Sequence, residues 1–244
     1  MRRLLPDPGD VDDAGLVDAY RPPAGRFLRV NFVTALDGAI SVDGKSAGLG
    51  SPGDQRVFRT LRALADVVLV GHGTAAAEGY GPMTADSSVG RLRASIGRTQ
   101  TAPIAVVSRR ASLAPGDRLA VPGTLLVTCA VADPERRAAL ADAGVEVLVC
   151  GDDDVDLPAA VDALADRGLE QVLCEGGPTL LAAALDAGVV DELDLSIAPA
   201  LVGGGEHRLL PAALPALVRL DLRQVLEEDG VLFTRYSTRT AVRG

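Results

Sequence analysis

Short runs of Val, Leu and Ile alternate with helix-like segments from residue 27 onward, and this alternation limits the folds open to the chain. Several runs are apolar at successive positions, as strands are when helices cover both faces of a parallel sheet. The last two runs are separated by Asp229-Gly230, a pair that suits a hairpin turn. The predicted strands are residues 27–35, 67–70, 104–107, 125–128, 145–149, 171–174, 193–198, 222–226 and 231–236. The sequence therefore predicts an α/β fold with a mostly parallel mixed sheet, flanking helices and a C-terminal antiparallel hairpin.

Two helix starts are marked by a capping residue followed by proline. Ser51 and Asp133 each precede a proline at the first helical position, with an acidic residue in the first turn. With 244 residues, 48% of them hydrophobic, the chain can bury one full core, and no interior linker divides it. We expect residues 1–25 to be a lead-in segment that contains a short amphipathic piece, and residues 26–244 to form a single domain.

Composition excludes several classes of partner. The net charge of −9 argues against a nucleic-acid surface, because the 24 Lys and Arg residues form no visible basic stripe. The first apolar stretch is broken at Pro6, and no run reaches the roughly 18 residues that a membrane helix needs. Cys129, Cys150 and Cys174 form no CxxC pair, which argues against a zinc site and a disulfide framework. We expect a cytoplasmic protein with buried thiols, no metal site, and no nucleic-acid or membrane partner.

The stretch CEGGPTLLAAAL joins a predicted strand to a predicted helix. Gly176 and Gly177 lack a Cβ atom, so a ligand could approach the backbone closely, and Pro178 suits the first helical turn. The helix start carries roughly half a positive charge, which would stabilise a phosphate. A plain strand-to-helix turn is the alternative interpretation of such a glycine pair.

A second glycine-rich strand end occurs in VVLVGHGT, where Gly71 and Gly73 are followed by Thr74. Two such strand ends in one sheet fit a long ligand that lies across it. A lone histidine is more often structural than catalytic, so neither His72, between these glycines, nor His207 is predicted to act in catalysis.

Two further strand ends carry polar residues. Asp37-Gly38 follows the first predicted strand and, taken alone, is typical of a tight turn. Ser108 and Arg109 follow the strand predicted at 104–107 and are residue types that bind a phosphomonoester, such as the 2′-phosphate of NADPH. Arginines after strands are also ordinary surface residues, so both interpretations stay open.

Four stretches, VNFVTALDGAI, LRALADVVLVGHGT, LCEGGPTLLAAAL and VVDELDLSIAPALVGGG, occur in the order and rough spacing of one protein family. Over about residues 27–236 the chain resembles the riboflavin-biosynthesis reductases, whose pyrimidine reductase domain is related to dihydrofolate reductase. The resemblance implies a dihydrofolate-reductase-like three-layer fold with a twisted mixed sheet, NADPH as the cofactor, and a homodimer. Bifunctional members also carry a zinc deaminase domain marked by HxE and PCxxC, and neither motif occurs here.

The resemblance places the cofactor at the glycine-rich strand ends. It implies that the turn at residues 176–178 holds the dinucleotide diphosphate and that the turn at residues 71–74 makes a second contact with the nucleotide. Ser108 and Arg109 match the adenosine end of the same ligand. The other positions that match the family's cofactor contacts are Gly71, Gly73, Thr74, Glu175, Gly176, Gly177, Pro178, Thr179 and Leu180.

On the substrate side, the resemblance implies a pocket for a ribosylaminopyrimidine phosphate. The matching positions are Asn31, Asp37, Ser46, Arg62 and Glu78. Glu78 stands where the family usually has an aspartate, and it is the candidate for orienting the amine or relaying a proton, with Asp37 as the alternative. The family's phosphate-gripping arginine is absent after Glu78, and Arg62, Arg91 and Arg93 are the candidates to replace it.

On this resemblance we predict an NADPH-dependent reductase of a phosphoribosylaminopyrimidine. Ring opening of the ribosylamine would give an imine, and hydride transfer to its C=N bond would give a ribitylamine. A reductase of the same fold that acts on dihydrofolate or another pterin-like acceptor is the first alternative, because it would account for the missing arginine. A non-catalytic module that binds a nucleotide is the alternative from another class.

Overall fold

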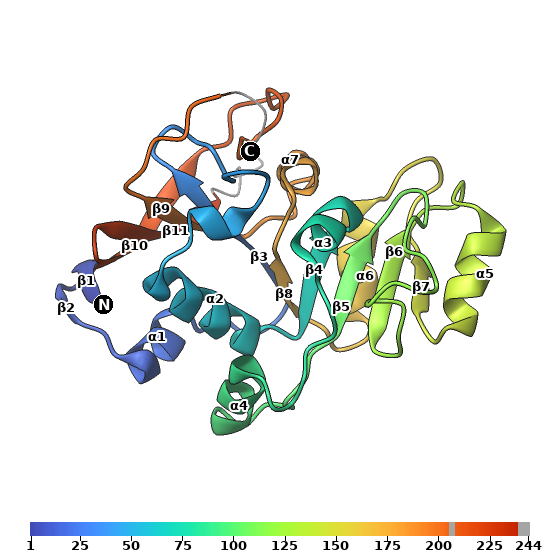
Figure 1. Ribbon diagram of the computed structural model, residues 1–244, viewed down its shortest axis with the longest axis horizontal. Coiled ribbons are helices and arrows are strands. Elements are labelled where there is room, and N and C mark those ends of the chain that lie inside the picture. The colour runs from blue at the N-terminus through green and yellow to red at the C-terminus, as the bar shows by residue number, and fades with distance from the viewer. Residues whose placement is uncertain (205–207, 239–244) are drawn as a thin grey trace, which may run out of the picture.

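One mixed sheet organises the chain (Figure 1). The computed structural model describes residues 1–204 and 208–238, and within them eleven strands pair in the order β2-β1-β10-β11-β9-β3-β8-β4-β5-β6-β7. Strands from β9 to β7 in this order pair in parallel, and those beyond β9 pair antiparallel. The strands are β1 (Arg2–Leu5), β2 (Gly9–Asp10), β3 (Phe27–Ala35), β4 (Val67–Gly71), β5 (Ile104–Val107), β6 (Thr124–Thr128), β7 (Glu146–Val149), β8 (Gln171–Cys174), β9 (Glu192–Ala198), β10 (Leu220–Glu228) and β11 (Val231–Thr238).

The helices begin where their capping residues predict. The Ser51 hydroxyl accepts a hydrogen bond from the Asp54 backbone at 3.0 Å, and the Asp133 carboxylate accepts one from the Glu135 backbone at 2.9 Å. The helices are α1 (Asp13–Ala19), α2 (Pro52–Leu64), α3 (His72–Glu78), α4 (Ser88–Ser95), α5 (Pro134–Asp142), α6 (Leu157–Ala165) and α7 (Pro178–Asp186), with a 3₁₀ turn at Ser46–Gly48.

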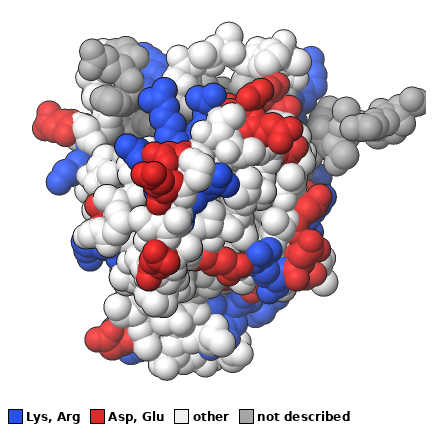
Figure 2. All heavy atoms as spheres, turned by 90° about the vertical axis from the view of Figure 1, so that its right-hand side faces the viewer, with Lys and Arg blue, Asp and Glu red and all other residues white. Residues whose placement is uncertain are grey.

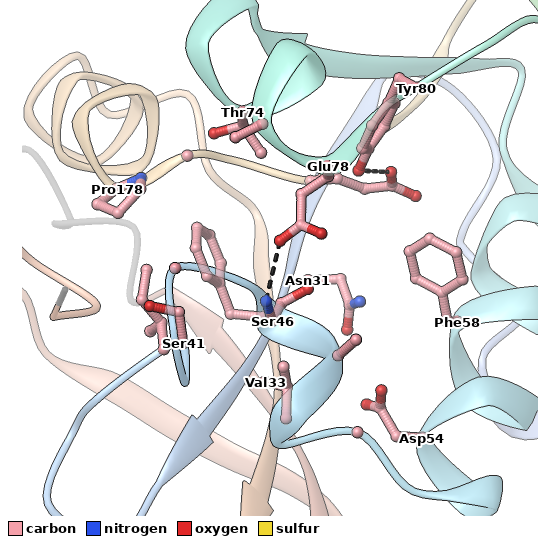
Figure 3. A pocket seen from close by; sticks show the side chains of 18 of the residues that line it. Asn31, Val33, Ser41, Ser46, Asp54, Phe58, Thr74, Glu78, Tyr80 and Pro178 are labelled. Carbon is pink, nitrogen blue, oxygen red and sulfur yellow. Dashed lines mark hydrogen bonds between the residues drawn. The ribbon is translucent and has the colours of Figure 1, made fainter. Parts of the chain in front are cut away.

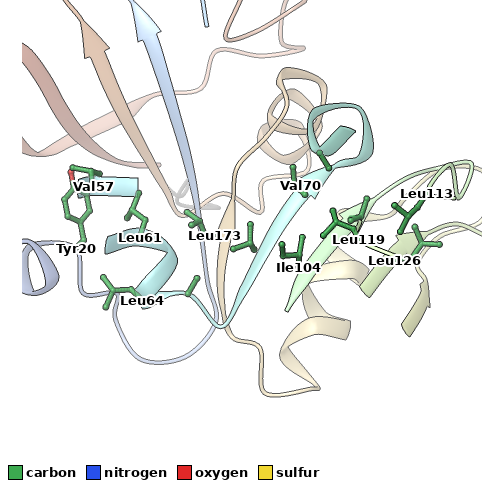
Figure 4. Packing of buried hydrophobic residues seen from close by; sticks show 14 of the residues in the cluster. Tyr20, Val57, Leu61, Leu64, Val70, Ile104, Leu113, Leu119, Leu126 and Leu173 are labelled. Carbon is green, nitrogen blue, oxygen red and sulfur yellow. The ribbon is translucent and has the colours of Figure 1, made fainter. Parts of the chain in front are cut away.

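Both faces of the parallel strands are buried, as their apolar runs predict. On β4, Val68 and Val70 face a cluster that includes residues of α1, α2, α3 and α5, part of which Figure 4 shows. Val67 and Leu69 face the opposite cluster, which α6 and α7 complete. Each such side chain contributes roughly 1.5–3 kcal/mol on burial. The predicted three-layer α/β fold is confirmed.

The antiparallel end of the sheet combines the predicted hairpin with strands that the sequence analysis did not predict. Asp229 and Gly230 both have positive φ, which is the conformation that a tight hairpin between β10 and β11 requires. The short strand β1 pairs with β10, and β2 pairs with β1, so the segment before residue 26 extends this edge. Its helix α1 lies where the amphipathic piece was predicted.

Four charged side chains tie β3, β9 and β11 together, and we call them the ion network. Three of them are buried and Arg235 is partly buried: Arg29, Glu192, Asp194 and Arg235. Arg29 lies 2.9 Å from the Glu192 carboxylate, and Arg235 lies 2.6 Å from it. Arg29 also donates to the carbonyl of Tyr20 at 2.7 Å, which anchors the end of α1. Burial raises the pKa of Asp194, and the neighbouring arginines oppose that shift.

The three cysteines are buried and free, as predicted. Burial raises the pKa of Cys174 to about 12, so this thiol is inert at neutral pH.

No helix in the described parts of the chain is long and apolar enough to cross a membrane. On the face at the β7 end of the sheet, acidic and basic side chains are interspersed (Figure 2).

Candidate functional site

The two glycine-rich strand ends lie side by side. β4 and β8 are parallel neighbours, and the Gly71 backbone donates to the Gly176 carbonyl at 2.7 Å. α3 starts directly after β4, and α7 starts after the short turn at residues 175–177 that follows β8, with Gly71 and Gly177 as their N-caps. Neither cap offers a side-chain acceptor, so the first-turn amides of both helices are left for another partner. This arrangement can hold an extended anion.

Close packing, as well as ligand access, requires glycine at residues 176 and 177. Gly176 has a φ of +81°, and a Cβ atom there would lie 2.4 Å from the Phe32 ring. A Cβ atom on Gly177 would lie 2.3 Å from the Thr74 hydroxyl. Gly73 differs, because nothing lies within 4 Å of the position its Cβ would take. The open surface for a ligand is therefore at the start of α3.

A cavity of about 470 Å³ adjoins the glycine turns and extends to α2 (Figure 3). Its volume is typical of small-molecule sites. Thr74 and Pro178 border it at the end nearest the turns, and Asp54 and Phe58 border it on α2. Glu78, at the end of α3, lies between these two ends. The cavity thus extends from the glycine turns, past Glu78, to α2.

Polar groups of the cavity wall are available to a ligand. The Glu78 carboxylate accepts a hydrogen bond from the Ser46 backbone at 2.9 Å, which links α3 to the 3₁₀ turn. The side-chain oxygens of Asn31 and Ser41 are buried and have no hydrogen-bond partner among the residues that the structure describes. A ligand that bonds to these two oxygens would satisfy them. The predicted site residues Asn31, Ser46 and Glu78 are therefore brought together, and their roles stay predictions.

Arg62 and Glu175 bind each other. Two nitrogens of the Arg62 guanidinium each donate to a Glu175 carboxylate oxygen at 2.7 Å, and the Tyr80 hydroxyl donates to the same carboxylate at 2.6 Å. Burial opposes the charge on Arg62, yet the Glu175 carboxylate raises the pKa of Arg62 above its usual value. Burial, and then the charge on Glu175, raise the pKa of Tyr80. These bonds occupy both Arg62, predicted to bind substrate, and Glu175, predicted to bind the cofactor.

The other candidates to replace the missing arginine also lie away from the cavity. Arg93 is 2% exposed and donates to backbone carbonyls, including those of Ala63 and Ala65. Arg91 donates to the carbonyl of Asp86 on the surface. Within residues 1–204 and 208–238, no lysine or arginine lines the cavity. This wall therefore offers no cation to a phosphate.

The structure does not bring Asp37 to the cavity. Its carboxylate accepts hydrogen bonds from the backbones of Gly203 at 2.7 Å and Val202 at 3.2 Å. The bond from Gly203 is the largest cause of a lowered pKa for Asp37. This carboxylate holds the loop after β9, so the position supports Glu78 over Asp37 as the group that could act on substrate.

The remaining predicted cofactor residues lie in different surroundings. The Ser108 hydroxyl accepts a hydrogen bond from the Ser112 backbone at 2.9 Å, and the Arg109 side chain donates to the Asp153 carbonyl at 2.7 Å. Thr179 is exposed, whereas Leu180 is buried in the core beneath α7. Among the histidines, His72 is absent from the cavity wall, and His207 lies outside the described residues.

Sequence reasoning missed Asp54, Phe58 and Tyr80. On α2, Asp54 and Phe58 precede Arg62 by eight and four residues, a spacing that places all three on one helix face. The prediction of Arg62 as a site residue could therefore have led to the other two. Burial raises the pKa of Asp54, and the neighbouring Ser196 hydroxyl opposes that shift.

No group of three or more potential metal ligands occurs within residues 1–204 and 208–238.

Comparison with known proteins agrees with this geometry. The family described as the RibD C-terminal domain matches residues 26–231. A pyrimidine reductase-like protein from Corynebacterium diphtheriae is 28% identical to the chain, with a TM-score of 0.81, and the similarity covers 93% of this chain and 99% of that one. No curated protein sequence matches.

More distant structures show the same fold. RibD from Acinetobacter baumannii is 21% identical with a TM-score of 0.71, and the similarity covers 88% of this chain and 58% of that one. The riboflavin biosynthesis reductase of Saccharomyces cerevisiae is 16% identical with a TM-score of 0.64, over 91% of this chain and 94% of that one. Fold and family together make the chain an oxidoreductase of the pyrimidine reductase class. It belongs to the RibD C-terminal domain family, which confirms the resemblance drawn from its motifs.

The glycine turns fit the nicotinamide dinucleotide that reductases of this kind generally use. The uncapped first turns of α3 and α7 would face its diphosphate, and Gly73 leaves the space that the diphosphate would fill. Thr74 and Pro178 would border the part that enters the cavity. The side chains present are therefore compatible with such a cofactor.

Proposed function

We propose that the chain is an NADPH-dependent reductase of a phosphoribosylaminopyrimidine, as in riboflavin biosynthesis. The observation that carries this proposal is the junction between two uncapped glycine turns and a cavity that contains Glu78. A dinucleotide on the turns and a small heterocycle in the cavity would meet near Thr74 and Glu78. Family membership supports the same reaction class.

The protein's contribution to this reaction is alignment and proton control. A reduced nicotinamide supplies a hydride to the C=N carbon of the acceptor. The cavity wall holds the acceptor against the turns, and this alignment lowers the entropic part of the barrier. The nitrogen must then gain a proton, and Glu78, fixed by the Ser46 backbone, is the group positioned to orient the amine or relay that proton.

The preference for NADPH over NADH is assigned to the end of β5. Arg109 is half-exposed and donates a hydrogen bond to the loop at Asp153, while the adjacent Arg110 is exposed and has no side-chain partner among the described residues. We expect Arg109→Ala to weaken NADPH more than NADH, because only NADPH carries the 2′-phosphate. Equal losses for the two cofactors, with Arg110→Ala as the matched comparison, would remove Arg109 from the phosphate site.

Oxidation of NADPH, monitored by absorbance, tests the proposed function. The purified protein is supplied with deaminated phosphoribosylaminopyrimidine in one reaction and dihydrofolate in another. Turnover of the pyrimidine supports the proposal. Turnover of dihydrofolate alone moves the assignment to another acceptor, and the absence of turnover with either substrate contradicts the proposal and favours a module that only binds nucleotide.

A reductase of an unphosphorylated, pterin-like acceptor is the second candidate. One observation favours it, namely that no lysine or arginine from the described parts of the chain lines the cavity. A phosphorylated substrate would have to project its phosphate beyond the cavity wall. Comparing a riboside acceptor with its 5′-phosphate separates the candidates, because a site with no phosphate contact should give similar KM values for both.

We also propose a cytoplasmic homodimer. Leu36 and Leu201 are 65% and 76% exposed, and the Leu36 backbone donates to Ala200 at 2.9 Å, so these leucines are near each other. Exposed apolar side chains of this size are typical of association surfaces. Light scattering should report a dimer that Leu36→Glu with Leu201→Glu converts to a monomer, and a monomeric parent protein would contradict the proposal.

The family match begins at residue 26, which supports the proposed boundary after the lead-in segment.

A further inference from the structure

The C-terminal end of α2 lacks the backbone cap that closes many helices. α2 ends at Leu64, and Ala65 follows in an extended conformation instead of the left-handed conformation that glycine allows. The Ala65 backbone donates to the Leu61 carbonyl at 3.1 Å. The last carbonyls of a helix have no donor within the helix, so those that follow Leu61 need donors from another part of the chain.

Arg93, on the neighbouring helix α4, supplies these donors (Figure 1). Its guanidinium donates to the carbonyls of Arg62 and Ala63 at 3.2 Å each, and to that of Ala65 at 2.5 Å. Its Nε atom donates to the Thr99 carbonyl at 2.6 Å. One side chain therefore joins the last turn of α2 to the loop after α4.

The charge of Arg93 is compensated by this helix end instead of by a carboxylate. Its side chain is almost fully buried, and it forms no ion pair within residues 1–204 and 208–238. Burial lowers the pKa of Arg93 to about 10, so the guanidinium still carries its charge at neutral pH. The C-terminus of a helix carries roughly half a negative charge, which stabilises a cation at this position. An apolar side chain could not replace Arg93 without leaving the buried carbonyls of Ala63 and Ala65 unpaired.

Arg62 connects this helix end to the cavity. Its carbonyl accepts from Arg93, while its guanidinium makes the two hydrogen bonds to Glu175, each 2.7 Å long. The same guanidinium lies 4.3 Å from the centre of the Phe58 ring and 5.2 Å from that of the Tyr80 ring. Phe58, Tyr80 and Glu175 all line the cavity, where Figure 3 shows the two rings. A shift of the Arg62 backbone would therefore be passed to three groups of the wall.

We propose that Arg93 is a positioning residue, which fixes the backbone of Arg62 and thereby holds Glu175 in its place in the cavity wall. Without Arg93, the last turn of α2 loses three hydrogen bonds, and a frayed turn cannot hold a long side chain in one conformation. A purely structural role would lower the stability of the whole protein and leave the pair of Arg62 and Glu175 intact in the folded state. The inference rests on the proposed function only where acceptor binding is used as a readout.

Proton exchange at the Arg62 Nε–H group, followed by NMR on the full chain, tests this inference. This group donates to the Glu175 carboxylate in the parent protein, so it should exchange slowly. In Arg93→Met we expect this exchange to be about tenfold faster or more, while the backbone amides of β4 keep their parent rates. Those amides report the stability of the core, so the comparison separates a local effect from a global one.

Arg98→Met is the matched control. Arg98 lies in the loop just after α4, and its side chain pairs with Asp66 instead of with the carbonyls of α2. Its loss should leave the Arg62 Nε–H group protected. Arg93→Lys is the second variant, in case Arg93→Met does not fold. Lysine keeps the charge without the planar fork, so it cannot reach the α2 carbonyls and Thr99 together, and we expect an intermediate exchange rate.

Steady-state kinetics add a readout that a structural role would not move. Glu175 and Tyr80 line the cavity, so an acceptor should bind less tightly when they are misplaced. We expect Arg93→Met to raise the KM for the acceptor about fivefold and to change kcat by less than about twofold, because the bond between Glu78 and Ser46 is unaffected. Arg98→Met should leave both constants close to those of the parent.

Parent-like Arg62 exchange in folded Arg93→Met or Arg93→Lys would overturn the inference. Equal acceleration in Arg98→Met, or an unchanged acceptor KM in an active Arg93→Met, would overturn it as well. The exchange measurement needs no substrate, so it decides the inference even if the protein turns over no acceptor, a result that would contradict the proposed function alone. Turnover of the pyrimidine together with Arg62 exchange that does not depend on Arg93 would leave the proposed function standing without the inference.

Discussion

Carboxylates are fully buried in one region of this molecule and partly buried in another, and the two regions differ in how they compensate the charge. In the ion network, Glu192 and Asp194 lie within 4 Å of two arginines, Arg29 and Arg235. In the cavity, Asp54 and Glu78 have no ion pair within the described parts of the chain. The network carboxylates are 5% and 2% exposed, so their charges are compensated inside the protein.

The difference separates structural charges from those available for function. A buried pair whose partners are both present contributes to one arrangement of strands, and losing one partner leaves a charge without compensation. A buried carboxylate that no cation neutralises costs stability in the free protein, and a ligand that donates hydrogen bonds to it would offset part of that cost. Glu175 combines the two patterns, because it lines the cavity yet is neutralised by Arg62.

The largest expected effect is on the ion network. Arg29→Met should lower the free energy of unfolding by about 3–5 kcal/mol, because it leaves Glu192 and Asp194 with one arginine and frees the Tyr20 carbonyl. Denaturant unfolding measures this loss. Arg26→Met, which removes an exposed pair with Asp162, is the control and should cost less than about 1 kcal/mol. Similar losses for the two variants would contradict the comparison.

In the cavity, Glu78→Gln should reduce kcat by about 100-fold, because the amide cannot relay a proton. The Ser46 backbone can still bond to the amide oxygen, so unfolding should be unchanged. Steady-state kinetics with NADPH and the accepted substrate, beside thermal unfolding, make the measurement. A variant with nearly full activity would remove Glu78 from the proton path.

Gly73→Val should weaken NADPH by about tenfold or more while the fold stays intact. The new side chain would enter space that is empty in the free protein and that the diphosphate would fill. Gly176→Val is less informative, because its side chain would strike Phe32 and its backbone has positive φ. Cofactor titration followed by fluorescence gives the affinities, and an unchanged value for folded Gly73→Val would exclude the start of α3 from the cofactor site.

The smallest expected effect is a gain in stability. A raised pKa in the folded protein means that ionising Asp54 costs free energy, a penalty that is absent below about pH 4 and grows as the pH rises through the folded-state pKa. Asp54→Asn should therefore unfold at a higher temperature than the parent at pH 7 and at a similar one at pH 4. A lower midpoint at pH 7 would mean that Asp54 stabilises the free protein.

Much of the fold could be predicted because its signals are local. The strand runs, the Ser51 and Asp133 caps and the Asp229-Gly230 turn each depend on a few neighbouring residues, and all occur as predicted. β1 and β2 were missed because they are short, and because β1 joins the sheet through β10, which is more than 200 residues away.

The candidate site was predicted less completely because its parts meet through the sheet. Asn31, Ser46 and Glu78 lie at one cavity as their motifs implied. Arg62 could not be placed from sequence, because its partner Glu175 is 113 residues away. Glu175 follows β8, whereas Arg62 lies on α2, the helix before β4. Asp37 was the alternative to Glu78 in the sequence, and the structure separates them by bonding the Asp37 carboxylate to the loop at residues 202–203.

The amino-acid sequence by itself determined the α/β layers, the two glycine-rich strand ends and the family, because periodicity, capping and short motifs are properties of contiguous residues. Tertiary structure alone decided which charges are compensated. Arg62 and Arg29 both precede their partners by more than 100 residues. Pairing of β3 with β9 brings Arg29 to Glu192, and packing of α2 against β8 brings Arg62 to Glu175. The tertiary structure also leaves Asp54 without a cation among the described residues. Sequence cannot show this, because the energy of two charges depends on their distance in space and on their burial.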